Sequence, residues 1–368
     1  MQITKHIENV MERDPQIIFV AIFSCLSCFI VINIYLHLVA SSLLVTFILG
    51  IIENALMLIF AYHTTNAIKR IRYSYINILI SGLIFMLGSY TQQNILLANL
   101  ILAGLLFLSI FSERHHNLFN TMIFFAIVSF LIGSGTLISN TNQIVYQGIA
   151  YAMGGWILIF IGIIRIQIRI HYFKINEQFI NNQNLPSKFL NFNYERIITF
   201  IYALFAVLLS NTFFLYFKID HGYWLPLTAF LITRSQHHIT KIRAKQRIIG
   251  TLFGCGFIYA CKEITDYLPF YMTLFILGIF FSIVGITKNY RFFSFFITVT
   301  ILTLLFITNK NFDVVANRLK YTIIAVVFTM SIAYIAKPFY NIFDSKQKKS
   351  LNNKKRFPTV TNLTAQNV

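Results

Sequence analysis

The most regular feature of the sequence is a succession of apolar runs separated by short polar segments. The longer runs, of about 16–24 residues, match an α-helix that crosses a hydrocarbon core about 30 Å thick, whereas barrel strands alternate over about 10 residues. The pattern predicts an all-α polytopic membrane protein with about twelve transmembrane helices. The expected spans are 16–36, 40–62, 74–90, 94–111, 117–135, 145–166, 196–217, 222–235, 247–261, 268–287, 291–308 and 319–337.

Two of these runs are shorter than the rest. The segments 222–235 and 247–261 flank a basic stretch, and Pro226 lies early in the first of them. A run of this length is too short to cross a bilayer as a straight helix. Half-spans or a bent hairpin are therefore the alternatives to two full spans.

A polar stretch at 181–187, which contains a proline, divides the chain into two sets of six runs. At an offset of 174 residues Lys69 coincides with Arg243 and Gly82 with Gly256, which favours a parallel pseudo-repeat. Coincidence in an isoleucine-rich sequence is the alternative. We expect a first six-span half at 1–166, a cytoplasmic basic linker at 167–195, a second six-span half at 196–337 and a disordered polybasic cytoplasmic tail at 338–368.

Composition excludes a soluble protein. The chain is 57% hydrophobic and 11% charged, whereas soluble domains carry about 25% charged residues. The net charge of +18 does not indicate nucleic-acid binding, because membrane proteins concentrate Lys and Arg in cytoplasmic loops. With both termini inside, 25 of the 30 Lys and Arg residues fall on the cytoplasmic side, and the outer loops hold Lys218, Lys262, Lys310, Arg318 and Lys320. The bias predicts cytoplasmic termini, and we expect the membrane to be a bacterial inner membrane.

Glu53 is the acidic residue that lies well inside a predicted span. A charge at the bilayer centre costs at least about 2.5–3.5 kcal/mol, so such residues usually face the bundle interior and have a function. Glu53 is a candidate proton-coupling site, and its neighbour Asn54 is a candidate for the same pathway. The alternative places Glu53 at the cytoplasmic mouth, paired with Lys69 or Arg70.

No catalytic or metal constellation is recognisable. The pairs His115-His116 and His237-His238 fall in predicted cytoplasmic loops, and adjacent helical residues point about 100° apart. The cysteines lie in apolar runs without a second metal half-site. We expect no enzyme activity, metal or cofactor.

The segment 220–254 carries the most chemistry. Tyr223 and Trp224 fit an aromatic belt at the outer interface. Thr228 follows, and a basic run contributes arginines suited to bidentate carboxylate binding. We expect a cationic cytoplasmic mouth formed by Arg234, Arg243 and Arg247. Plain positive-inside topology is the alternative for the basic run.

This segment resembles the fusaric acid resistance-like family, which includes bacterial aromatic acid exporters. The resemblance covers residues 195–260 and rests on Gly222-Tyr223-Trp224, Leu227-Thr228 and the run from Arg247 to Gly254. Relatives often have Pro near the position of Ser235 and large cytoplasmic domains after each membrane half. Neither feature is found here, and a partner acting in trans could supply what those domains do.

The resemblance implies export of small organic anions, often aromatic carboxylates, and the buried acid Glu53 is the candidate for coupling this export to protons. A passive organic-anion channel and a membrane assembly protein without transport are the alternatives. A major-facilitator transporter is disfavoured, because the loop from Tyr62 to Arg72 contains neither Gly nor Asp. Expected partners are organic anions, membrane lipids, a second copy of the chain and a periplasmic adaptor protein.

Overall fold

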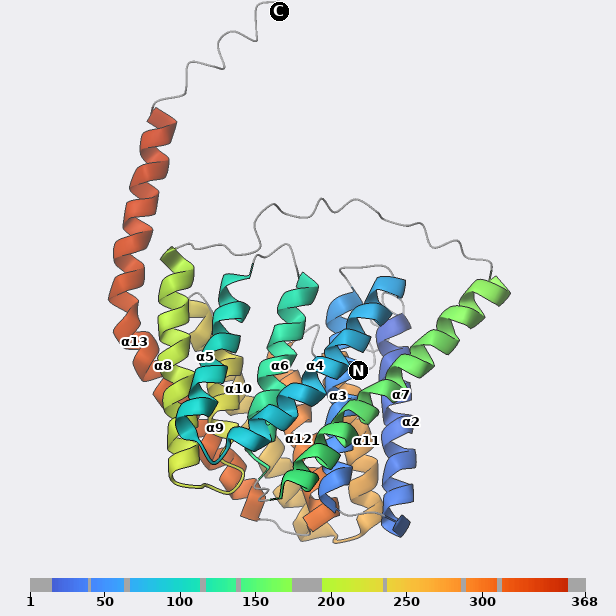
Figure 1. Ribbon diagram of the computed structural model, residues 1–368. Coiled ribbons are helices and arrows are strands. Elements are labelled where there is room, and N and C mark those ends of the chain that lie inside the picture. The colour runs from blue at the N-terminus through green and yellow to red at the C-terminus, as the bar shows by residue number, and fades with distance from the viewer. Residues whose placement is uncertain are drawn as a thin grey trace, which may run out of the picture.

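A computed structural model describes residues 15–38, 41–62, 67–112, 117–136, 140–173, 194–233, 237–285, 289–309 and 313–356 (Figure 1). These residues form a bundle of twelve α-helices. The helices are α2 (Pro15–Leu38), α3 (Ser41–Tyr62), α4 (Ala67–Thr91), α5 (Ile95–Phe111), α6 (Asn117–Ser134), α7 (Thr141–Phe173), α8 (Tyr194–Tyr216), α9 (Trp224–Ile232), α10 (His237–Ile264), α11 (Leu268–Gly285), α12 (Tyr290–Asn309) and α13 (Asp313–Arg356).

Each predicted span overlaps one of these helices, which confirms an all-helical membrane protein. Within the described residues, seven helices are long and apolar enough to cross a membrane, and three shorter apolar stretches lie in α2, α5 and α6. The remaining two helices are α9 and α10, which carry the weakest predicted spans. At 1.5 Å per residue the 9 residues of α9 reach only about 14 Å, half of a bilayer core. The internal repeat and the side on which the termini lie stay predictions.

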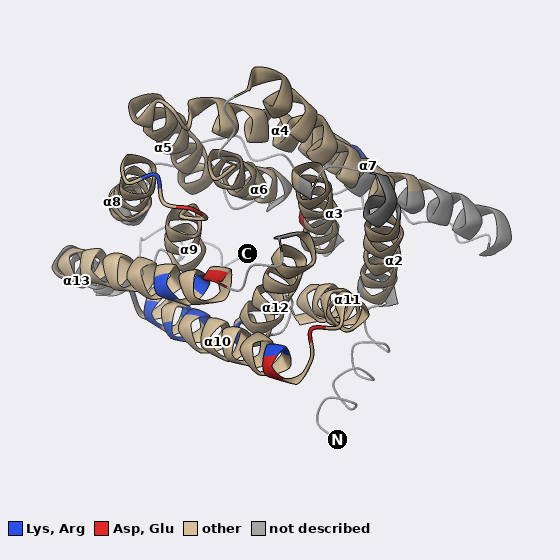
Figure 2. Ribbon diagram, turned by 90° about the horizontal axis from the view of Figure 1, so that it is seen from below, with Lys and Arg blue, Asp and Glu red and all other residues tan. Residues whose placement is uncertain are grey.

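Four helices occupy the inside of the bundle. Viewed along its axis, α3, α6, α9 and α12 are surrounded by the other helices (Figure 2). Burial agrees with this arrangement, since 67% of the span in α3 is buried but only 33% of the span in α13. Eight of the nine residues of α9 are buried. The half-span therefore forms part of the protein interior and not of its lipid-facing surface.

The two predicted halves share their cores. One cluster joins residues of α2 and α3, such as Ile51, to Phe275 of α11. A second joins residues of α5 and α6, such as Phe130, to Trp224 of α9. The halves therefore pack as one body with mixed interiors.

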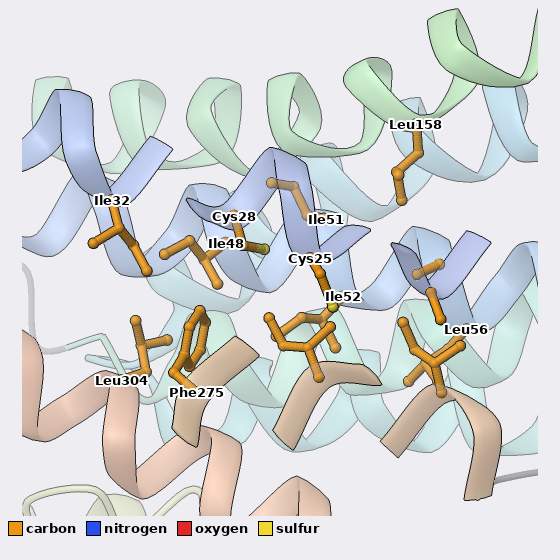
Figure 3. Packing of buried hydrophobic residues seen from close by; sticks show 14 of the residues in the cluster. Cys25, Cys28, Ile32, Ile48, Ile51, Ile52, Leu56, Leu158, Phe275 and Leu304 are labelled. Atoms are coloured by element: carbon orange, nitrogen blue, oxygen red, sulfur yellow. The ribbon is translucent and has the colours of Figure 1, made fainter. Parts of the chain in front are cut away.

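Buried cysteines belong to the first of these clusters. Cys25 and Cys28 lie among Ile48, Ile51 and neighbouring aliphatic side chains (Figure 3). The Cys25 thiol donates to the main-chain oxygen of Ile276 at 3.3 Å. Both cysteines act as small packing residues between α2, α3 and α11.

Two glycines bring α3 and α7 into backbone contact. A Cβ at Gly50 would overlap the carbonyl oxygen of Tyr151, and a Cβ at Gly154 would overlap that of Phe47. Small residues permit such close approach between membrane helices. The contact sets Glu53, one turn beyond Gly50, opposite Tyr151.

The last helix differs from its prediction at both ends. We expected a span at 319–337 with Arg318 in an outer loop, but α13 begins at Asp313 and Arg318 is fully buried within it. The helix also continues to Arg356, into the segment for which disorder was expected. Acidic Asp313 in the first turn suits a helix N-terminus. The loop assignment of Arg318 was therefore wrong.

Candidate functional site

A cavity of about 610 Å³ lies between the two halves of the chain. Its walls are mainly Leu, Ile, Val and Phe side chains of α3, α6, α9 and α12. Polar groups interrupt these walls at few positions. They are Glu53, Ser109, Asn120, Thr121, Tyr151, Arg243, Arg247, Tyr290 and Arg318.

The cavity extends deep into the bundle. Along α6 it is lined from Asn120 to Ile132, which at 1.5 Å per residue spans about 18 Å. Asn120 is near the N-terminal end of α6, which lies at the same end of the bundle as the C-terminal end of α7 and the N-terminal end of α8 (Figure 1). Arg318 is near the opposite end, in the second turn of α13. The cavity thus connects one end of the bundle with groups well beyond its middle.

Glu53 contributes the carboxyl group of this cavity. Its side chain is 4% exposed. Ser81 Oγ donates to Oε1 at 2.6 Å and Ser129 Oγ donates to Oε2 at 2.7 Å. The Tyr151 hydroxyl also donates to Oε2. Donors from α4, α6 and α7 therefore replace part of the hydration that burial removes from the carboxylate.

Arg247 and Arg318 contribute two buried positive charges, at 1% and 0% exposure. Nε and Nη1 of Arg247, and all three guanidinium nitrogens of Arg318, have no hydrogen-bond partner in the described part of the chain. The two guanidinium groups also act on each other electrostatically. Buried charges are normally paired, because an unpaired one costs several kcal/mol. Two like charges facing one cavity favour an anion between them.

Aromatic rings support the arginines. The guanidinium carbon of Arg318 lies 4.4 Å from the centre of the Trp224 ring, and that of Arg243 lies 4.4 Å from the centre of the Tyr290 ring. Such contacts contribute about 0.5–2 kcal/mol each. They orient the cations without supplying a negative charge.

The loop before α9 holds Trp224 in place. His221 adopts a left-handed backbone conformation, with φ of 56°, which is uncommon for a residue other than glycine. Its ring stacks on Trp224 at 5.5 Å between centroids. Burial lowers the pKa of the His221 imidazole, and Asp220 acts in the opposite direction. The predicted place of Trp224 in an outer aromatic belt is wrong, because its side chain is 0% exposed.

The structure gathers three of the predicted site residues around the cavity. Glu53, Arg243 and Arg247 line it together. Arg234 lies outside the described residues. Of the others, Trp224 supports Arg318, Tyr223 packs on Gly135, Thr228 is buried within α9 and Asn54 faces Gly155 of α7.

Sequence reasoning missed Arg318 and the hydroxyl groups that surround Glu53. Arg318 was assigned to an outer loop, although it stands five residues after Asp313 at the start of a long apolar stretch. An arginine inside such a stretch is itself a signal of function. The pairing of Ser81, Ser129 and Tyr151 with Glu53 carries no comparable signal, because the four residues are far apart along the chain.

The fold and this cavity define a multi-pass α-helical membrane protein with a charged interior. Residues 196–332, from α8 into α13, match the family model described as fusaric acid resistance protein-like. The matched residues include the Gly-Tyr-Trp motif, so the match supports the resemblance that this motif indicated. The matched range includes Arg247 and Arg318 but not Glu53.

A curated relative is an uncharacterized protein of Haemophilus influenzae, 32% identical over 103 residues. The alignment covers 26% of this chain and 14% of the relative. The chain therefore matches about one seventh of that protein. No solved structure matches this chain.

Proposed function

We propose that the protein transports small organic anions, aromatic carboxylates among them, across the bacterial inner membrane, and that Glu53 couples this transport to protons. The family matched by the second half favours membrane transport in general. The direction of transport, the substrate and the coupling to protons go beyond what the family match supports and are part of this proposal. The cavity between the halves is the route.

One observation carries the proposal: Arg247 and Arg318 line a cavity with apolar and aromatic walls, and guanidinium nitrogens of both lack a hydrogen-bond partner among the described residues. A carboxylate can accept two parallel hydrogen bonds from a guanidinium group, which a neutral or cationic solute cannot do. Phe124 and Phe293 offer surfaces for a ring attached to that carboxylate. The chemistry of the walls therefore suits an aromatic acid.

Benzoate binding tests the anion site. The chain contains two tryptophans, so a Trp156→Phe variant leaves Trp224, which contacts Arg318, as its sole indole reporter. We expect benzoate to change the fluorescence of this purified variant, and neutral benzyl alcohol to leave it unchanged. In the same background, Arg318→Gln should weaken benzoate binding about tenfold or more, because hydrogen bonds to charged groups contribute about 1.5–3 kcal/mol.

Lys241→Gln is the matched control, since it removes one positive charge from an exposed position on α10 outside the cavity. Arg247→Gln provides a second variant in case Arg318→Gln does not fold. Equal benzoate affinity in the control and in both arginine variants would contradict the anion site.

Glu53→Gln tests the coupling and separates a transporter from a passive channel. In proteoliposomes, we expect the variant to bind benzoate but to lose benzoate flux driven by a pH gradient. The flux driven by a benzoate gradient, without a pH gradient, is measured for comparison in the variant and in the wild type. If pH-driven flux is the same with glutamine, the protein is a passive anion pathway, and if neither protein moves any acid, the assembly-protein alternative is favoured.

A further inference from the structure

A second polar feature lies beside the cavity, on one face of α4. Ser74, Asn77 and Ser81 follow the spacing of one helix stripe and are each at most 1% exposed. On the adjacent positions, Ile78 meets Gly155 and Gly82 meets Ala152, so this side of α4 packs on α7. The stripe is therefore enclosed between helices and not directed to lipid.

Polar atoms of this stripe lack protein partners. They are Ser74 Oγ, both amide atoms of Asn77, and Oδ1 of the adjoining Asn54, judged over the residues that the structure describes. Leaving such a group unsatisfied costs about 1–3 kcal/mol. Buried polar groups in this situation are normally bridged by internal water, which needs two to four polar partners. Ser74 Oγ and the two amide atoms of Asn77, about one helix turn apart on α4, provide three such partners.

Glu53 joins this stripe to the arginine cavity. Ser81, at one end of the stripe, donates to Oε1, while Ser129 and Tyr151 donate to Oε2. Asn77 also lies close enough to act on the carboxyl group. None of Ser74, Asn77 and Asn54 lines the cavity. The carboxyl group thus has two separate polar environments.

The stripe leads from Glu53 toward one end of the bundle. Seven residues separate Ser81 from Ser74, which corresponds to about 10 Å along α4. Ser74 is two residues from the exposed Arg72. A short column of water along the stripe is therefore sufficient to reach the surface at that end.

We propose that this stripe, which we call the α4 track, is a water-filled path that carries protons between Glu53 and the Arg72 end of α4, apart from the anion cavity. The inference rests on the proton-coupling role of Glu53 proposed above. A hydronium ion at the Arg72 end gives up one proton, each water passes one on and receives one, and an O–H bond forms on the Glu53 carboxylate. Release reverses these steps, so no other reactant is consumed.

Charge explains why protons use the α4 track. Tyr151 faces Glu53 from α7, and the charged or titratable groups that share the cavity with it are Arg243, Arg247, Tyr290 and Arg318. Three of these carry positive charge, which repels hydronium in a poorly hydrated space. The α4 track contains only neutral hydroxyl and amide groups. Proton and anion therefore reach the site by different routes.

Hydrogen–deuterium exchange at Glu53 tests the path without relying on transport. In the full-length protein in lipid nanodiscs, the infrared band of the protonated Glu53 carboxyl is identified by its loss in Glu53→Gln. After transfer to D₂O, we expect Asn77→Leu and Ser74→Ala to slow the isotope shift of this band about tenfold. Each substitution removes a polar group that binds water, and losing such a hydrogen bond in a buried site costs about 1–3 kcal/mol.

Ser282→Ala is the matched control, because Ser282 is another buried serine whose hydroxyl lacks a partner among the described residues, but on α11. It should exchange at the wild-type rate. Retained benzoate-dependent fluorescence of Trp224 verifies that the α4-track variants fold. Wild-type exchange in both α4-track variants, or slowed exchange in Arg247→Gln alone, would overturn the inference. A protein that binds no benzoate but keeps this exchange pattern would contradict the proposed function and leave the path in place.

Discussion

The contact between Trp224 and Arg318 places a cation and an indole together inside a membrane protein. Among the residues that the structure describes, the guanidinium nitrogens of Arg318 have no hydrogen-bond partner, so the ring provides one of the few favourable interactions for this group. Its loss should reduce how well Arg318 is oriented for an anion.

At this scale we expect Trp224→Leu to weaken binding of radiolabelled benzoate by between about twofold and thirtyfold, corresponding to about 0.5–2 kcal/mol. Trp156→Leu should bind as wild type, since Trp156 is 40% exposed and meets Tyr75 at the outside of the bundle. Equal losses in the two variants would show that the effect is not specific to the Arg318 contact.

A second residue-scale prediction concerns the Tyr151 hydroxyl. Tyr151→Phe keeps the ring that stacks on Phe85 but removes a donor to Glu53, and should destabilise the protein by about 1–3 kcal/mol. Chemical unfolding in detergent measures this change. The loss should be smaller in a Glu53→Gln background, where no carboxylate needs the donor. Tyr75→Phe, at an exposed position, should have little effect.

At the scale of helices, the α3–α7 pair depends on glycine. We expect Gly50→Ala to lower the thermal unfolding temperature, because the added methyl group overlaps the main chain of Tyr151 and forces the helices apart. Gly104→Ala and Gly256→Ala are controls, since a Cβ at either position meets nothing within 4 Å. These two should be neutral or stabilising, because alanine favours a helix over glycine by up to about 1 kcal/mol.

Helix α9 shows which elements a sequence pattern identifies poorly. Hydropathy located the run at 222–235, but the helix is only 9 residues long and almost wholly buried. A buried half-span and a lipid-facing full span are both apolar, so hydropathy cannot separate them. The early Pro226 and the short length were the available signals, and both indicated an incomplete span.

At the scale of the whole molecule, the distribution of Lys and Arg predicts which end of the bundle faces the cytoplasm. The cysteines at 25, 28, 255 and 261 are free and buried, so introduced thiols can be labelled against a low background. In intact spheroplasts, we expect an impermeant maleimide to modify Asp266→Cys and to modify Lys241→Cys only after the membrane is opened. The reverse pattern would contradict the orientation.

Features that depend on local sequence were predicted, whereas features that depend on tertiary packing were not. Helix class and approximate span positions follow from local apolar runs, and Glu53, Arg243 and Arg247 follow from charge in or beside such runs. The place of Trp224 was wrong because aromatic residues near a span end usually mark an interface, whereas the turn at His221 directs this one inward. Arg318 was wrong because its position depends on where α13 begins. The Glu53 hydroxyl cluster required tertiary packing.

The glycine contact between α3 and α7 also has a mechanical consequence. Where Gly50 and Gly154 bring main chain against main chain, no side chains separate these helices that could be compressed or rearranged, and closely packed protein transmits strain. Glu53 and Tyr151 are therefore expected to keep a fixed separation and to move together with α3 and α7. A working cycle that alters the spacing between the carboxyl group and the arginines must displace α10 or α13 as a unit. Paired spin labels on α3 and α7 should keep a constant separation through that cycle, while labels on α3 and α10 should not.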